Sequence, residues 1–123
     1  MNIVLLEPEM PSNTGNIGRT CVATDTTLHL IEPLGFTLNE KKIKRAGLDY
    51  WDKLKLYRYS DFEDFLEKNP KAKIRLYMAT TKAEKTYAEV SYEEDDYIMF
   101  GKESAGIPEE ILIRDKESCI RIP

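Results

Sequence analysis

Short, continuous apolar runs recur along this chain, and most lead into a segment rich in glycine, proline, threonine or asparagine. The runs are Asn2–Leu6, Leu28–Ile31, Leu54–Tyr57, Ile74–Met78, Tyr97–Phe100 and Cys119–Ile122. Continuous apolar runs are typical of strands that are buried on both faces, as in parallel sheets. With 123 residues in all, we expect one α/β domain whose mostly parallel sheet carries helices on both faces.

Helical signals lie between these runs. The expected helices are Asn16–Thr24, Glu40–Ala46, a helix after Ser60 and a helix after Pro108. The expected start signals are Ser12–Thr14, Asn39, a capping box of Ser60 with Glu63, and Pro108 at a first helical position. Strand, helix and strand at this spacing favour the parallel arrangement.

The carboxyl ends of parallel strands share one edge, which is where open α/β folds bind ligands. Gly15 and Gly18 allow close backbone approach next to a helix N-terminus, and Arg19 in the first turn could contact a phosphate or a polarised hydroxyl. In the segment Gly101–Gly106, two glycines favour a backbone that wraps around a small molecule. By itself, each segment is equally compatible with an ordinary turn.

A basic run, Lys41–Arg45, precedes Tyr50 and Trp51. Such a patch could hold RNA phosphates while an aromatic ring stacks on a base. A solvated helix face explains the charges equally well, and the two aromatics also suit a core or a subunit contact. Because the net charge is −4, any contact with RNA must come from a local patch or a partner subunit.

Several functions are disfavoured by composition. Cys21 and Cys119 lack the spacing of a zinc site or a disulfide scaffold, so we expect both in the core of a protein from a reducing cytosol. The one histidine, His29, lies in an apolar run and is expected to pack as a neutral ring. Glu93–Asp96 indicates a solvated turn, and we expect no metal site. The N-terminus carries no signal peptide or membrane span, which indicates a soluble cytoplasmic protein.

Nine segments, taken in order, match a known family. They are Asn2–Leu5, Glu7–Glu9, Asn13–Arg19, Leu28–Phe36, Lys44–Tyr50, Thr80–Lys82, Phe100–Glu103, Gly106–Pro108 and Ile120–Pro123. With them the chain resembles the SPOUT superfamily of RNA methyltransferases, in its SpoU-like class. Within that class it is similar to the TrmL-type tRNA (cytidine/uridine-2'-O)-methyltransferases, which modify the wobble nucleotide.

The resemblance implies a trefoil-knotted α/β fold, a homodimer, and methyl transfer from S-adenosylmethionine to a ribose in the tRNA anticodon stem-loop, with S-adenosylhomocysteine as product. It implies cofactor contacts at Ala79, Gly101 and Ile122. Arg19 matches the arginine that assists deprotonation of the ribose hydroxyl. The resemblance also implies RNA-binding or supporting roles for Asn13, Lys44, Arg45 and Glu103.

Members of this family continue beyond the segment that matches Ile120–Pro123, through an Asn/Ser-rich motif and a helix that close the knot. We therefore expect residues 1–123 to form a single SPOUT methyltransferase domain without that knot-closing segment.

Two other classes of function remain open from the residues. One is a dinucleotide-binding oxidoreductase, because Gly15 and Gly18 follow the first run and Glu32 ends the second, although the full Gly-x-Gly-x-x-Gly is absent. The other is a non-catalytic RNA-binding protein that uses Lys41–Arg45.

Overall fold

One parallel sheet organises the residues that the computed structural model describes, which are 1–37, 49–81, 83–114 and 116–121. Within them the strands are β1 (Asn2–Leu6), β2 (Thr27–Ile31), β3 (Leu56–Tyr59), β4 (Leu76–Ala79), β5 (Tyr97–Phe100) and β6 (Cys119–Ile120). Their order is β3-β2-β1-β5-β4-β6, and each neighbouring pair is parallel. The predicted parallel sheet is confirmed.

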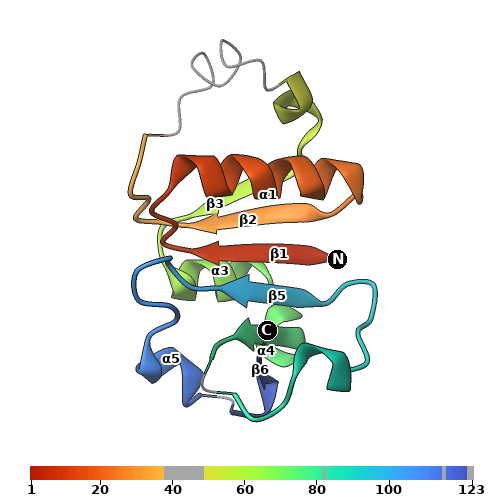
Figure 1. Ribbon diagram of the computed structural model, residues 1–123, viewed down its shortest axis with the longest axis vertical. Coiled ribbons are helices and arrows are strands. Elements are labelled where there is room, and N and C mark those ends of the chain that lie inside the picture. Colours follow the sequence, from red (N-terminus) through yellow and green to blue (C-terminus); the bar gives the residue numbers. More distant parts are fainter. Residues whose placement is uncertain (38–48, 82, 115, 122–123) are drawn as a thin grey trace.

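Helices cover both faces of this sheet (Figure 1). The α-helices are α1 (Pro11–Ala23), α3 (Phe62–Lys68), α4 (Ala72–Arg75) and α5 (Glu109–Leu112), and the short 3-10 helices are η1 (Asp49–Lys53), η2 (Tyr87–Glu89) and η3 (Lys116–Ser118). Helix α1 packs on one face, where Cys21 joins Leu5 and Leu28. Helices α3, α4 and α5 contribute to the core of the other face, around Phe65 and Val4. Successive side chains of β1 point to opposite faces of the sheet, so β1 contributes to both cores.

The predicted helix starts were wrong by one to several residues. Helix α1 begins at Pro11 rather than at Asn16, and no side chain of its preceding residue caps it. Proline suits a first helical position because its missing N–H would have no partner there. Before α3, Asp61 accepts the N–H of Asp64 at 2.7 Å, so the cap is not the predicted box. Pro108 stands just before α5 rather than within it.

Two strands are shifted toward the C-terminus relative to the predicted runs. Strand β3 covers Leu56–Tyr59 instead of 54–57, and β4 covers Leu76–Ala79 instead of 74–78. Ile74 belongs to α4 and its side chain is 79% exposed, so an apolar residue type misled the prediction there. The predicted helix over 40–46, with its cap at residue 39, lies outside the described residues.

The acidic run is only partly the solvated turn that was predicted. Glu93 and Glu94 are exposed, but Asp96 is only 1% exposed. Its two carboxylate oxygens accept Nε and Nη2 of Arg75, each at 2.7 Å. Burial acts to raise the pKa of Asp96, but the bonds from Arg75 and the Glu93 N–H outweigh it and lower the pKa. This paired carboxylate ties the start of β5 to the end of α4.

His29 is the packed neutral ring that was predicted. Its Nε2 lies 2.9 Å from the Oδ1 of Asn2, and its Nδ1 lies 2.8 Å from the hydroxyl of Tyr59. Because the amide oxygen only accepts, Nε2 donates and Nδ1 accepts the tyrosine proton. Burial lowers the pKa of His29 to about 4. Cys21 and Cys119 are likewise buried and unbridged, as expected.

Acidification from pH 6.5 to pH 4 is expected to lower the free energy of unfolding by about 3 kcal/mol through His29 alone. The pKa is 6.5 when the ring is solvated and about 4 in the fold, so the unfolded chain takes up the proton first as the pH falls. The contribution is complete above pH 6.5 and disappears through pH 4. Urea unfolding across this range measures it.

A His29→Gln variant should lose that pH dependence between pH 6.5 and 4, because His29 is the only histidine in the chain. The same fact makes its ring signals in NMR unambiguous. A titration midpoint near 6.5 in the folded protein would contradict the expectation.

Candidate active site

The ends of β4 and β5 bring two of the predicted cofactor residues to one edge of the sheet. Ala79, the last residue of β4, is the register partner of Phe100 in β5 and of Ile120 in β6. Gly101 follows Phe100 directly, so it lies beside Ala79 at this edge. Ile122 lies outside the described residues. Two of the three predicted positions are therefore adjacent.

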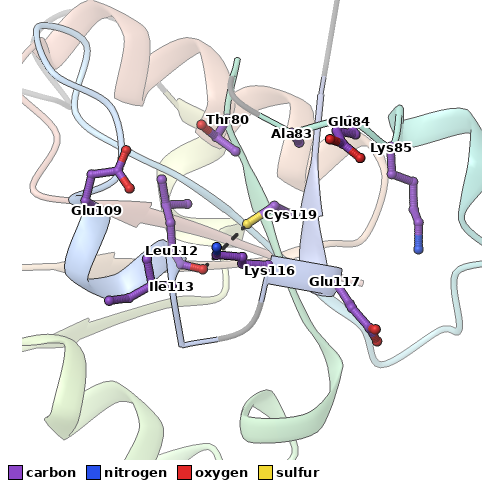
Figure 2. A pocket seen from close by; sticks show the side chains of 10 residues that line it. All are labelled: Thr80, Ala83, Glu84, Lys85, Glu109, Leu112, Ile113, Lys116, Glu117 and Cys119. Atoms are coloured by element: carbon purple, nitrogen blue, oxygen red, sulfur yellow. Dashed lines mark hydrogen bonds between the residues drawn. The ribbon is translucent and has the colours of Figure 1, made fainter.

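A groove of about 750 Å³ opens just past these strand ends (Figure 2). Its lining residues are Thr80, Ala83, Glu84, Lys85, Glu109, Leu112, Ile113, Lys116, Glu117 and Cys119. Leu112 and Ile113 give it an apolar wall, and the thiol of Cys119 lies 3.9 Å from the carbonyl oxygen of Leu112. Small-molecule sites usually have volumes of about 300–1,000 Å³ with mainly apolar walls and a few polar groups. The groove has the size of such a site, but it is more polar than most, because six of its ten lining residues are polar or charged.

The loop after β5 folds back on itself at its two glycines. A Cβ on Gly101 would lie 2.0 Å from the backbone carbon of Gly106 and 2.2 Å from the nitrogen of Ile107. Gly106 adopts φ +70°, which side chains disfavour. The space beside Gly101 is thus filled by the loop's own backbone. The expectation that the missing side chain leaves room for a ligand was wrong for this glycine.

Glu103, in that loop, is hydrogen-bonded to the segment that follows β1. The N–H of Glu9 donates to its Oε2 at 2.9 Å, and the N–H of Ser104 donates back to Oε1 of Glu9 at 2.8 Å. Burial acts to raise the pKa of Glu103, but hydrogen bonds from the Glu9 N–H, its own N–H, the Asn13 side chain and the Met10 N–H outweigh it and lower the pKa. The structure thus brings Asn13 and Glu103 together.

Glu103 also places a carboxylate at the start of α1. Met10 precedes α1 and gives it no side-chain cap, and the Glu103 carboxylate accepts the N–H groups of Glu9 and Met10 just before the helix. A negative charge there is favourable to the helix dipole. Sequence reasoning missed Glu9 as the reciprocal partner, because residues 94 positions apart in the chain carry no local signal of pairing.

Replacing Glu103 by alanine is expected to lower the free energy of unfolding by about 1 kcal/mol, because the N–H groups of Glu9 and Met10 lose a charged acceptor. It should also speed hydrogen exchange in the first turn of α1, which mass spectrometry of peptides resolves. Glu67→Ala removes a carboxylate from the exposed surface of α3 and is the matched control. Equal exchange rates in α1 for the two variants would show that Glu103 does not stabilise the start of the helix.

A second hollow, of about 330 Å³, is lined by both Glu103 and Gly101. Its lining residues are Leu5, Pro8, Asn13, Thr14, Asn16, Ile17, Phe100, Gly101 and Glu103. The hydroxyl of Thr14 is buried and, within the described part of the chain, has no hydrogen-bond partner. A buried hydroxyl without a partner is costly, and a polar group of a ligand in this hollow would relieve that cost.

Arg19 stands apart from both hollows. It lies on the exposed side of α1, in the third turn rather than the first, and its guanidinium carbon is 5.5 Å from the centre of the Tyr50 ring. Gly15 and Gly18 lie in the middle of α1 and face Tyr50 and Trp51 of η1. They do not form the predicted phosphate-binding turn, because the helix begins four residues earlier than Gly15.

The dinucleotide-binding alternative loses its sequence basis for the same reason. Its glycines would have to stand between β1 and the following helix, but both lie inside α1. Glu32, the expected ribose ligand, is paired with Arg58, whose Nη2 lies 2.5 Å from its Oε1. The positions of Lys44 and Arg45, and with them the predicted RNA-binding run, lie outside the described residues.

No group of three or more histidine, cysteine, aspartate or glutamate side chains is placed to hold a metal ion among the described residues. In the same part of the chain, none of the helices has the length and apolar character needed to cross a membrane.

Known proteins match the whole chain. The tRNA (cytidine(34)-2'-O)-methyltransferase of Escherichia coli K12 is 48% identical over 125 residues, which cover all of this chain and 78% of that protein. A structure solved to study the 2-OH methylation of C/U34 on tRNA superposes with a TM-score of 0.89 at 43% identity, and covers 99% of this chain and 78% of that one.

The fold extends to more distant proteins. The AdoMet-bound rRNA methyltransferase of Sinorhizobium meliloti has a TM-score of 0.80 at 23% identity, and covers 99% of this chain and 46% of that one. The family model of the SpoU rRNA methylases matches residues 1–123. Sequence and fold agree, and this chain belongs to the SpoU rRNA methylase family.

Proposed function

We propose that this chain transfers the methyl group of S-adenosylmethionine to the ribose 2'-hydroxyl of nucleotide 34 in tRNA, the wobble cytidine or uridine. The observation that carries the proposal is the 48% identity, over the full length of this chain, to the Escherichia coli enzyme named for that reaction. S-adenosylhomocysteine is then the second product.

The residues at the strand ends fit this cofactor. Ala79 and Gly101 lie side by side at the carboxyl ends of β4 and β5, and the groove beyond them has an apolar wall at Leu112. Three glutamates and two lysines line the same groove, and the small excess of negative charge favours a ligand that carries positive charge. The buried hydroxyl of Thr14 beside Gly101 adds a polar group without a partner. Ile122 would complete the set of cofactor contacts.

When bound, the cofactor supplies a methyl group that is already electrophilic. The protein's tasks are then to align the ribose hydroxyl with that methyl and to ease removal of its proton. Arg19 can stabilise the developing alkoxide, or hold a phosphate that takes the proton, because its guanidinium is permanently charged and donates in a planar fork. Asn13 and Glu103 support the loop beside the cofactor, and Lys44 and Arg45 contact the anticodon stem-loop.

Residues 1–123 act, in this proposal, as one SPOUT-type domain in a cytoplasmic homodimer. An apolar hollow of about 470 Å³ on the α1 side of the sheet supports the dimer, because Ile3, Ile17 and Phe100 line it, and exposed apolar surface favours association. Sedimentation velocity tests the dimer: a monomer at micromolar concentration would contradict it.

The reaction is tested by incubating the protein with radiolabelled S-adenosylmethionine and either unmodified tRNA or ribosomal RNA. We expect label in tRNA and not in ribosomal RNA. Label in neither RNA, combined with tRNA binding in a filter assay, would instead favour the non-catalytic RNA-binding alternative. If NAD but not S-adenosylmethionine protected the protein against thermal unfolding, the result would favour the dinucleotide-binding alternative.

A further inference from the structure

The side chain of Arg19 would have wide rotational freedom on the exposed side of a helix, yet an aromatic ring faces it among the described residues. The ring of Tyr50, in η1, faces the guanidinium, whose central carbon is 5.5 Å from the ring centre. A cation at this distance over an aromatic face is attracted by the ring quadrupole. The ring therefore favours one placement of the guanidinium over the others.

Tyr50 is itself fixed against α1. Its hydroxyl donates to the carbonyl oxygen of Gly15 at 2.5 Å, and its ring meets that of Trp51 edge-on at 6.3 Å. In an α-helix the carbonyl of residue 15 also accepts the N–H of residue 19. Tyr50 thus contacts Arg19 through the side chain and contacts the carbonyl that pairs with the Arg19 backbone.

Glycine at position 18 allows a close approach of η1 to α1. A Cβ there would lie 3.3 Å from the side chain of Leu54, 3.4 Å from Trp51 and 3.5 Å from Tyr50, so even alanine would be tightly packed against these side chains. Burial raises the pKa of Tyr50, although the charge of Arg19 opposes this. The phenol therefore stays protonated at neutral pH and keeps donating to Gly15.

We propose that Tyr50 is a positioning residue, which holds the guanidinium of Arg19 in the orientation that methyl transfer requires. This inference rests on the proposed function, in which Arg19 assists removal of the ribose proton. It also gives the helical Gly18 a role: its missing side chain lets η1 pack closely against α1.

The test separates the ring of Tyr50 from its hydroxyl. Tyr50→Phe keeps the ring and loses the bond to Gly15, whereas Tyr50→Leu loses both. We expect kcat for tRNA methylation to fall about twofold in Tyr50→Phe and about tenfold in Tyr50→Leu, with KM for tRNA unchanged in both. The Nε–H signal of Arg19 in NMR, without cofactor or RNA, should carry a ring-current shift in the wild type and Tyr50→Phe but not in Tyr50→Leu.

The chain offers a matched control in Arg75, whose guanidinium carbon is also 5.5 Å from a ring centre, that of Tyr77. Tyr77→Leu should leave both kcat and the Arg19 signal unchanged. An Arg19 signal that is the same in Tyr50→Leu and the wild type would overturn the proposal, as would equal losses of kcat in Tyr50→Leu and Tyr77→Leu. Failure of the wild type to methylate tRNA would overturn the proposed function, while the NMR comparison would still decide whether Tyr50 holds Arg19.

Discussion

Replacing Arg19 by alanine is expected to lower kcat for tRNA methylation about 100- to 1,000-fold, the range seen when a charge-stabilising or proton-transfer group is removed. The affinity for S-adenosylmethionine should not change, because Arg19 lines neither of the hollows at the strand ends. Stability should change little, since the side chain is exposed. Single-turnover methylation and calorimetric titration of the cofactor measure the two effects separately.

Arg19→Lys refines this expectation. Lysine keeps the charge but not the planar fork, so we expect it to recover only a small part of the lost rate. Arg58→Ala removes another exposed arginine, one that pairs with Glu32, and should leave kcat intact. If Arg19→Ala turned over like Arg58→Ala, Arg19 would have no part in the chemistry.

Gly101→Ala is expected to cost about 3 kcal/mol of stability, because the added carbon has no room and the loop backbone must move. It would stand 2.0 Å from the backbone of Gly106, where no flexible side chain can yield. Because the same loop carries Glu103 and borders Ala79, its movement should also weaken binding of S-adenosylmethionine at least tenfold. Urea unfolding and calorimetric titration give the two numbers.

Gly106→Ala is the control for this steric argument. A Cβ at Gly106 meets no atom within 4 Å, and only the positive φ of +70° opposes it. The expected cost is therefore about 1 kcal/mol, the usual penalty for an L-residue in the left-handed region. A Gly101→Ala variant that is no less stable than Gly106→Ala would show that the loop relaxes freely.

The sheet and its ligand-binding edge could be predicted from the sequence. Runs such as Asn2–Leu6 and Tyr97–Phe100 are apolar at every position that the two cores need, and both strands have the predicted bounds. Glycine after the second of these runs marked the edge where Gly101 lies beside Ala79. A strand that is buried on both faces can be recognised from its own residues, because each of its positions must be apolar.

The contacts that position the candidate site could not be read in the same way. Glu9 meets Glu103, and Arg19 meets Tyr50, only because distant segments are folded together. Neither pair has a spacing rule in the sequence. The start of α1 was misplaced because polar residues after Pro11 resemble a cap, whereas the stabilising carboxylate comes from another loop. A helix start that depends on a tertiary partner cannot be predicted from the propensities of the neighbouring residues.

The position of the transferred methyl group tests the central claim most directly. Two tRNAs are incubated with the protein and S-adenosylmethionine: an unmodified tRNA, and a second tRNA that carries a 2'-deoxy sugar at nucleotide 34. Each is then digested, and mass spectrometry of the fragments locates the added methyl group. The account predicts one methyl on the ribose of nucleotide 34 in the first tRNA and none in the second. A methyl on a base, or a deoxy-substituted tRNA methylated as well as the first, would contradict it.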